Sequence, residues 1–283
     1  MTSYLDLPTY VYDQMTPQEK EQIITKEFYK PVVIRGLYKP NALKLGFEKT
    51  RNLFGNERLP VEVYRTPETG KFASHTGRCD IAYLTNHWKK DKRPYLYCAE
   101  VDLIGANFQK DRKEKLLSNL KNPNTPSRGV QELLLYLGKN HTSGLHLHVG
   151  SDFILNQLFG SKTIYIFSNY DNPSVRKNNI VTDFNKCNFA VDDFFKMDHS
   201  KMKIYKATLE PGDSITIPPW YWHATQGHGL NMSITQTYNR YNILYLLSNP
   251  NIILDYITSG DDMYIIPLII IIILVFYMSR KRR

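Results

Sequence analysis

The chain has 283 residues, of which 42% are hydrophobic and 13% aromatic, and its formal net charge is +9 at pH 7. These values exclude an intrinsically disordered chain and allow one large domain or two small ones with a substantial core. The positive charge permits an acidic partner such as RNA or anionic lipid but identifies none, because lysine-rich solvated helix faces give the same value.

The three cysteines, Cys79, Cys98 and Cys187, lie far apart and form no CxxC pair. Their spacing gives no support to a zinc finger or to thioredoxin-type redox chemistry. An odd, sparse set of this kind is typical of reduced, buried thiols in a cytosolic domain. The first residues, MTSYLDLPTYVYDQ, lack a basic stretch followed by an apolar one, so we expect no secretory signal there.

The first half of the chain is predicted to mix helices and strands. A helix is expected after Thr16, which is a good N-cap, because Pro17 suits the first helical position and Glu19 completes a capping box. The segments KPVVIRGLY, LPVEVYRT and RPYLYCAEVDL predict strands. The segments PNALKLGFEKTRNLFG, ending at Gly55, and NFQKDRKEKLLSNLKNPNTP predict helices.

From Glu132 onward the pattern is that of short strands. These are ELLLYLG, GLHLHVG, FILNQLFG, KTIYIFS, KIYKATLE, DSITIPP and NMSITQTY, separated by Gly, Pro and Asn-Pro. Closely spaced strands with such turns predict a small antiparallel barrel or sandwich. The segment NRYNILYLLSNPNIILDYI then returns to a helical pattern, and TSGDD is predicted to be a short linker.

The C-terminal segment MYIIPLIIIIILVFYM, Met263 to Met278, carries no charged residue. As a helix rising about 1.5 Å per residue it falls somewhat short of a hydrocarbon core about 30 Å thick. Flanking Tyr264 and Tyr277, followed by RKRR, are typical of a membrane interface. We therefore predict a single-pass transmembrane anchor at residues 263–279 and a basic tail at 280–283, with the main domain in the cytosol.

Two histidines in the stretch SGLHLHVGSD raise the question of a metal site. If GLHLHVG is a strand, His146 and His148 share one face and can bind one metal ion together. The later segment LEPGDSITIPPWYWHATQ has a Pro-Gly-Asp turn and a strand before His223, which could join them from another strand. Two or three histidines with a carboxylate and open positions suit Fe(II) or a similar first-row ion.

Several segments together resemble one protein family. PVVIRG, RPYLYCAEVDL, ELLLYLGKNHTSGLHLH, NQLFGSKTIYIFS and LEPGDSITIPPWYWH are similar in layout to the JmjC/cupin-8 group of Fe(II)- and 2-oxoglutarate-dependent hydroxylases, above all to its asparaginyl hydroxylases. The most specific are the Gly-x-Lys after an aliphatic strand and the Pro-Gly-Asp turn followed by Ile-Pro-x-x-x-Trp-His. The resemblance covers about residues 30–240 and implies a mainly β fold with flanking helices, the double-stranded β-helix (cupin or jelly-roll) barrel.

The resemblance also implies roles for individual residues. His146 matches the first metal ligand and His223 the distal one. Lys162 matches the lysine whose ammonium pairs with the far carboxylate of 2-oxoglutarate, and a fixed cation is a sensible anchor for a dicarboxylate. Ser143 and Tyr95 fall where the family places hydroxyls that reach this cosubstrate. The implied cofactors are Fe(II) and 2-oxoglutarate, with no catalytic residue beyond the metal ligands.

The second metal ligand departs from the family, which has Asp or Glu where this chain has His148. Three interpretations remain open. His146, His148 and His223 form an all-histidine triad; or Asp152 supplies a carboxylate, as in the older cupin motif; or the site is degenerate and the domain only binds a partner. Four protein ligands would leave two open positions, which 2-oxoglutarate would fill, so the second interpretation favours a cupin enzyme that does not use it.

The remaining candidates receive weaker predictions. Trp220, Tyr221 and Trp222 are predicted to be core residues, and Asp213 is predicted to close its turn. His228 and Asn231 are expected on a loop, where they could orient a substrate, although a turn role is favoured. The histidines at positions 75, 87, 141 and 199 have no partner at an informative spacing, so we assign them no function.

The predicted organisation is an N-terminal helical segment (1–30), a JmjC/cupin-like domain (31–240) and C-terminal helices (241–258) before the anchor. The leading hypothesis is a membrane-anchored dioxygenase that hydroxylates a protein side chain or RNA. One alternative is a non-catalytic, membrane-tethered cupin-fold binding protein. The other is a metal-dependent cupin enzyme that does not use 2-oxoglutarate. Neither the substrate nor the oligomeric state follows from the sequence.

Overall fold

The computed structural model describes residues 4–25, 30–54, 58–65, 73–81, 85–86, 90, 97–105, 110–125, 130–148, 151–168, 179–183, 187–190, 194–219 and 221–239. The chain divides into two compact units, residues 1–239 and 240–283. Within the described parts, no helix has the length and apolar character needed to cross a membrane. The predicted anchor at 263–279 and the predicted helices at 241–258 lie outside the described residues.

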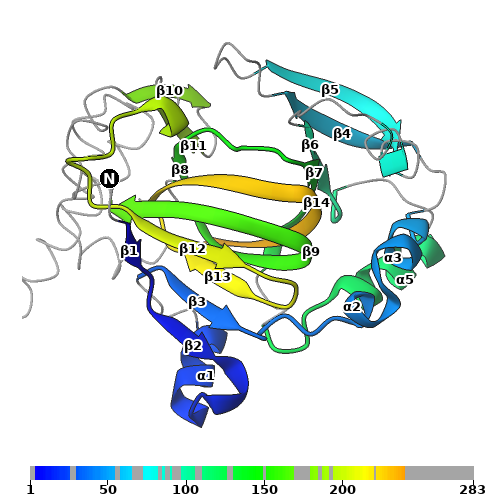
Figure 1. Cartoon of the computed structure of the whole chain (residues 1–283). Coiled ribbons are helices and arrows are strands. Elements are labelled where there is room, and N and C mark those ends of the chain that lie inside the picture. Colours follow the sequence, from blue (N-terminus) through cyan, green and yellow to red (C-terminus); the bar gives the residue numbers. More distant parts are fainter. Residues whose placement is uncertain are drawn as a thin grey trace, which may run out of the picture. The chain divides into compact units, whose positions relative to one another are not determined.

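The first unit is mainly β, as the sequence predicted, and its strands form one large mixed sheet (Figure 1). The main strand order is β2-β3-β13-β9-β14-β7-β6-β4-β5, with β1, β8, β10, β11 and β12 attached beside it. Their bounds are β1 Leu5–Asp6, β2 Thr9–Val11, β3 Val32–Arg35, β4 Arg58–Arg65, β5 Ala73–Asp80, β6 Tyr97–Asp102, β7 Val130–Lys139, β8 His146–His148, β9 Ser151–Ser168, β10 Asn179–Asp183, β11 Cys187–Ala190, β12 Tyr205–Leu209, β13 Ser214–Ile217 and β14 Tyr221–Asn239.

The described helices are short: α1 Pro17–Thr25, α2 Asn41–Leu45, α3 Phe47–Asn52 and α5 Lys110–Leu120, with 3-10 turns η1 Tyr12–Gln14 and η2 Phe194–Lys196. The capping box of α1 is confirmed, because Thr16 N donates to Glu19 Oε2 at 2.7 Å and Glu19 N donates to Thr16 Oγ1 at 3.2 Å. The single helix predicted for PNALKLGFEKTRNLFG is wrong. Gly46, at φ +79°, divides it into α2 and α3.

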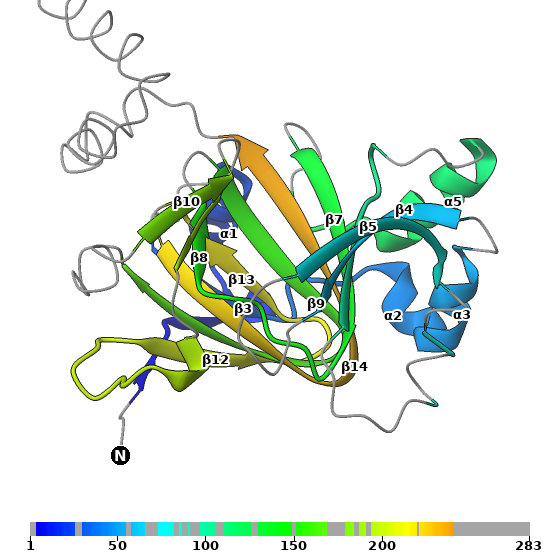
Figure 2. The ribbon, with the colours of Figure 1, turned by 90° about the horizontal axis from the view of Figure 1, so that it is seen from above.

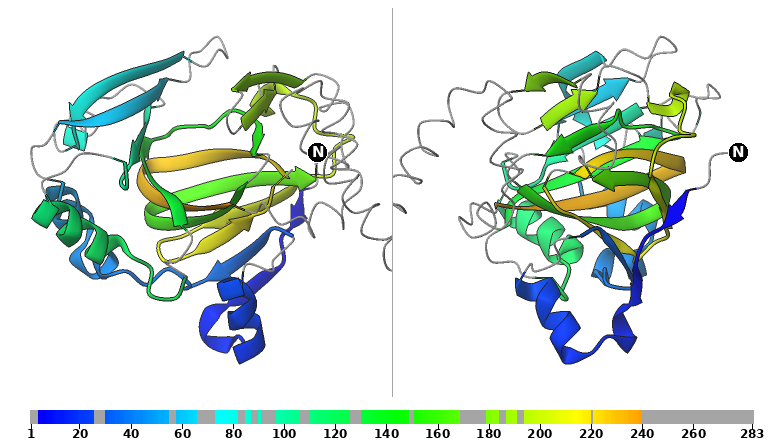
Figure 3. Two further views of the ribbon diagram at one scale, coloured as in Figure 1. Left: turned by 180° about the vertical axis from the view of Figure 1, so that it is seen from behind. Right: turned by 90° about the vertical axis from the view of Figure 1, so that its left-hand side faces the viewer.

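The two longest strands, β9 and β14, each bend and pair with one another twice. Residues 161–168 of β9 pair with 221–228 of β14, and residues 151–159 pair with 232–239. Gly160 (φ +66°) and Gly229 (φ +61°) lie at the bends, which meet at one end of both strands (Figures 1 and 3). A Cβ on Gly160 would lie 2.6 Å from the Leu230 carbonyl oxygen, so only glycine fits there. The prediction of separate strands for FILNQLFG and KTIYIFS is therefore wrong.

This bending creates an inner and an outer face. Leu155 from the first half of β9 and Ile164 from its second half belong to one apolar cluster, so that cluster lies inside the bend. The residues on the opposite face, such as Leu158 and Ile234, pack instead against α2 and α5. Figure 2 shows these helices and α3 grouped on one side of the sheet. Since side chains alternate along a strand, the face of each residue on β9 and β14 follows from its register.

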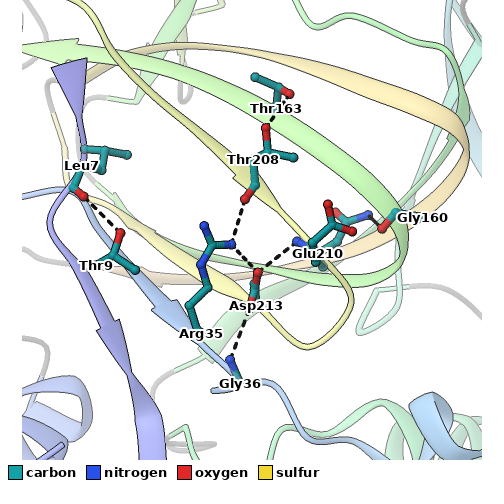
Figure 4. Close-up of polar contacts among 10 residues, drawn as sticks. Leu7, Thr9, Arg35, Gly36, Gly160, Thr163, Thr208, Glu210 and Asp213 are labelled. Atoms are coloured by element: carbon teal, nitrogen blue, oxygen red, sulfur yellow. Dashed lines mark hydrogen bonds and ion pairs between the residues drawn. The ribbon is translucent and has the colours of Figure 1, made fainter. Parts of the chain in front are cut away.

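The turn before β13 is fixed by Asp213, as predicted (Figure 4). Its carboxylate pairs with the Arg35 guanidinium and accepts the main-chain N–H of Gly36 at 3.2 Å and of Glu210 at 3.0 Å. Arg35 also donates to the Thr208 carbonyl at 2.8 Å. A buried carboxylate with several donors is a stabilising arrangement, and here it ties β3 to the β12–β13 turn.

Candidate metal centre

Three histidine side chains meet at the end of the inner face that lies away from the bends. His146 on β8 is the register partner of His223 on β14. The candidate ligand atoms of His146, His148 and His223 all lie within 4.8 Å of one another, and this is the group found among the described residues. The ring centroids of His146 and His223 are 4.2 Å apart, and that of His148 lies 5.0 and 5.2 Å from them.

Main-chain hydrogen bonds orient two of these rings. Nδ1 of His146 lies 2.8 Å from the Gly144 carbonyl oxygen, and Nδ1 of His223 lies 3.0 Å from that of Tyr221. A carbonyl oxygen only accepts, so each Nδ1 must carry the proton and each Nε2 keeps its lone pair. Metal-binding histidines are commonly held in this way, with the distal N–H donated to a carbonyl.

Burial disfavours the protonated form of two of these rings, His146 and His223. Desolvation lowers the pKa of His146 below its usual value. It lowers the pKa of His223 well below that value, and the neighbouring His146 adds to the effect. His223 is 4% exposed, whereas His146 and His148 are half-buried. Neutral imidazoles at the edge of an interior are suited to bind a metal ion without first losing a proton.

Asp152 is not part of this group. The ring centroid of Phe153 lies 3.9 Å from that of His148, so Phe153 faces inward. Asp152 is its neighbour on β9 and points to the opposite face. Asp152 therefore shares the outer face with Ile154 and Asn156. The structure thus brings together the all-histidine set, while the ligand set itself remains a prediction.

Two predicted cosubstrate residues follow the triad deeper along the inner face of β14. Inner residues of β14 after His223 are Thr225 and Gly227. The Ser143 hydroxyl accepts from Thr225 N at 2.8 Å and contacts Thr225 Oγ1 at 3.1 Å. Gly227 is the register partner of Lys162. His223, Ser143 and Lys162 therefore lie in sequence from the triad to the bend, and His223 and Gly227 are about 13 Å apart at ~3.3 Å per residue.

Lys162 is buried in this interior, at 2% exposure. Its ammonium donates to the Ser233 hydroxyl at 2.6 Å and lies 5.6 Å from the centroid of the Tyr136 ring. Burying an ammonium is costly, so a lysine in this position is more typical of a ligand site than of a stabilising core. Lys162 is therefore not a solvated lysine at a strand end.

The interior also contains polar residues that were not predicted to bind the metal or the cosubstrate. Buried side-chain atoms of this interior that have no hydrogen-bond partner among the described residues include Nδ1 of His141, Oε1 of Gln157, Oδ1 of Asn231 and Oγ1 of Thr237. Gln157 and Thr237 share the inner face through their partners Ser233 and Phe153. Another such atom, Nδ2 of Asn122, lies in the turn after α5. Unpartnered buried polar atoms are few in native proteins and often mark a ligand or water site.

His141 was missed because no sequence spacing connects it to the site. The structure buries it at 2% exposure, and burial together with the charge of Lys162 holds its pKa well below the usual value. Asn231 was expected on a loop, and that prediction is wrong, because it lies buried in β14 and pairs with Gly138. The glycines at 138 and 227, which make room for these side chains, were the available signal.

The remaining predicted residues lie elsewhere. Tyr95 and Trp220 are outside the described residues. Trp222 is fully buried, as predicted for a core residue. His228 also lies in β14 rather than on a loop, and its Nε2 is 2.8 Å from Thr163 Oγ1. His199 accepts from the Tyr4 hydroxyl at 3.1 Å and donates to the Phe194 carbonyl at 2.7 Å, away from the triad.

Comparison with known proteins adds no assignment, since neither a protein-family model nor a curated protein sequence matches the chain.

Proposed function

We propose that this chain is an Fe(II)- and 2-oxoglutarate-dependent dioxygenase of the JmjC/cupin-8 type, which hydroxylates a protein side chain or RNA. The observation that carries the proposal is one interior with three convergent imidazoles at one end and a buried ammonium near its bends. We also propose that the bent strands belong to a double-stranded β-helix. The double pairing of β9 with β14 supports this topology.

The residues present fit a first-row metal ion. His146, His148 and His223 offer imidazole nitrogens within 4.8 Å of one another, and two of them have their Nδ1 protons engaged by carbonyls. Imidazole suits iron, and three protein ligands leave positions for other molecules. When bound, Fe(II) would supply the chemistry that couples decarboxylation of 2-oxoglutarate to insertion of one oxygen atom of O₂ into a C–H bond.

The chain's own residues would bind and orient the cosubstrate. Lys162 would pair with its distal carboxylate, and Ser233 would hold the ammonium in place. The Lys162 ammonium meets Ser233, and the register position of Gly227, the partner of Lys162, is ~13 Å along β14 from that of His223. A short dicarboxylate with one end at the triad and the other at Lys162 would bridge the two. Ser143 lies between them, where its hydroxyl can contact the ligand.

His148 changes the charge balance of the proposed site. A carboxylate would offset one of the two charges of Fe(II), whereas three neutral imidazoles offset none. Together with the Lys162 ammonium, the interior would then present three positive charges to its ligand. This arrangement favours an anionic cosubstrate and supports a dicarboxylate rather than a neutral molecule.

The test is succinate formation from 2-oxoglutarate by the full chain with Fe(II) and O₂. We expect succinate from the wild-type chain and its loss in Lys162→Ala, while Lys201→Ala, at an exposed lysine, behaves as the wild type. Metal binding without succinate formation would favour a cupin enzyme that does not use 2-oxoglutarate. Absence of metal binding would leave the non-catalytic binding protein.

We further propose that residues 263–279 anchor the chain in a membrane. The uncharged run between two interfacial tyrosines and the basic RKRR tail supports this. Deleting 263–283 should move the protein from the membrane fraction to the soluble fraction, and continued sedimentation with membranes would contradict the proposal.

A further inference from the structure

The His141 ring occupies a niche formed by two glycines on neighbouring strands. A Cβ on Gly138 of β7 would lie 2.1 Å from His141 Nδ1, and a Cβ on Gly227 of β14 would lie 2.8 Å from the same atom. Both distances are far shorter than any van der Waals contact, so the ring fills the volume that side chains at these positions would occupy. Glycine is therefore needed at both positions for the His141 imidazole to fit.

The niche lies beside Lys162. Gly227 is the register partner of Lys162, and register partners have their side-chain positions about 5 Å apart on the same face. The influence of the Lys162 charge on the His141 pKa agrees with this proximity. A ligand whose carboxylate reaches Lys162 therefore arrives next to the His141 ring.

The hydrogen bonding of His141 points to a ligand as well. Its Nδ1 is buried and has no hydrogen-bond partner among the described residues, and the same holds for Oδ1 of Asn231, whose side chain shares the niche. By contrast, the buried His199 has both ring nitrogens engaged. A buried polar atom without a partner costs about 1–3 kcal/mol, so its retention needs a reason outside the folded apo chain.

We propose that His141 is the specificity-determining residue that sets the length of the dicarboxylate accepted by this interior. Its ring closes the space beyond the Lys162 ammonium, and its Nδ1 hydrogen-bonds the distal end of the ligand. The wild-type niche then fits a five-carbon 2-oxo dicarboxylate and excludes a six-carbon one. This inference rests on the proposed function, because it assumes that a dicarboxylate spans from the triad to Lys162.

The test is a reversal of ligand preference. Calorimetric titration of the full chain, loaded with Mn(II), would measure the Kd of 2-oxoglutarate and of 2-oxoadipate. In His141→Ala the freed niche should weaken 2-oxoglutarate and strengthen 2-oxoadipate, so that their Kd ratio moves by about 10-fold or more, the usual effect of one methylene in a fitted pocket. The Mn(II) affinity should stay unchanged.

His199→Ala is the matched control, because it removes a buried imidazole outside the interior. It should leave the Kd ratio unchanged. If His141→Ala does not fold, His141→Asn retains a polar group while shortening the side chain, and the ratio should move in the same direction by a smaller factor.

The outcomes separate this inference from the proposed function. If the wild-type chain binds 2-oxoglutarate and His141→Ala and His141→Asn keep its Kd ratio, the length-setting role of His141 is wrong and the proposed function stands. If the metal-loaded wild-type chain binds neither dicarboxylate, both are overturned. A gain in 2-oxoadipate affinity cannot result from general damage to the fold and would support the inference.

Discussion

The inner and outer faces of β14 are both buried, yet they have opposite chemical character. Outward residues such as Met232 and Ile234 join an apolar cluster with β7, α2 and α5. Inward residues are polar and are buried to a similar degree: His223, Thr225, Ser233, Thr235 and Thr237. Polar groups in an interior cost stability unless they are paired, so the outer face stabilises the fold and the inner face retains polarity for a ligand.

The two faces also differ in how their polar groups are hydrogen-bonded. On the outer face, Asn156 donates to Gln236 Oε1 at 3.1 Å, and Ser214 donates to Asn156 Oδ1 at 2.7 Å. Thr125 adds a further hydrogen bond to Gln236 at 3.0 Å. Within the part of the chain described, the inner face instead keeps unpartnered atoms such as Thr237 Oγ1. Substitutions on the two faces should therefore have opposite effects.

The largest stability effect is expected on the outer face. Ile234→Ala removes a buried side chain from the apolar cluster and should lower the free energy of unfolding by about 3 kcal/mol. Urea denaturation of the metal-free protein measures this change. Metal affinity, measured under conditions where the variant is folded, should be unchanged. A marked loss of metal affinity would show that the two faces are not separable.

The second-largest effect is expected from acid, which should destabilise the protein through histidines of the interior. The pKa values of His141, His146 and His223 are lowered, so the unfolded chain takes up protons below about pH 6.5 while the folded chain does not. Stability is therefore fully present above pH 6.5 and is lost as the pH falls. We expect a loss of roughly 2–3 kcal/mol for metal-free protein between pH 7.5 and 5.5. A flat profile in thermal unfolding would contradict the burial of these rings.

Removing a hydrogen-bonded polar group should lower the free energy of unfolding, whereas removing an unpartnered one should raise it. Asp213→Ala leaves the N–H groups of Gly36 and Glu210 without their acceptor and should cost about 2 kcal/mol, allowing for the partial exposure of Arg35. Asp213→Asn retains one acceptor oxygen and should cost less. Equal unfolding midpoints for the two variants and the wild type would show that the turn does not depend on this carboxylate.

The smallest change is expected from removing an unpartnered hydroxyl on the inner face. Thr237→Val keeps the shape of the side chain and eliminates a buried oxygen without a partner among the described residues, so it should raise the free energy of unfolding by about 1 kcal/mol. The same denaturation assay detects it. Destabilisation instead would show that Thr237 supports the fold and that its oxygen is satisfied in solution.

The local features of this fold were accessible from the sequence because they depend on neighbouring residues. The Thr16–Glu19 capping box needs only the spacing of two side chains, and it forms as predicted. The alternation of GLHLHVG likewise placed His146 and His148 on one face. Features that depend on strand pairing were not accessible. The bends at Gly160 and Gly229, which separate the inner from the outer face, are of this kind.

For the segment NMSITQTY, the sequence predicts the strand but not the surroundings of its side chains. Its alternation predicts a strand, and the usual expectation is that its Ser and Thr residues face solvent. In the structure they face a buried interior, because β14 pairs with both halves of the bent β9. The role of His141 was not accessible for the same reason. Its position beside Lys162 depends on Gly227, which adjoins the His141 ring and is the register partner of Lys162. The choice between His148 and Asp152 also required knowing which face of β9 looks inward.

The most direct test of the account is the metal content of the full chain after incubation with Fe(II) or Mn(II), together with variants of the competing ligands. We predict one metal ion per chain, lost in His223→Ala and in His148→Ala, with affinity reduced by more than about 100-fold, and retained in Asp152→Asn. Absence of stoichiometric binding, or binding that depends on Asp152 and not on His148, would contradict a metal centre built from the three imidazoles.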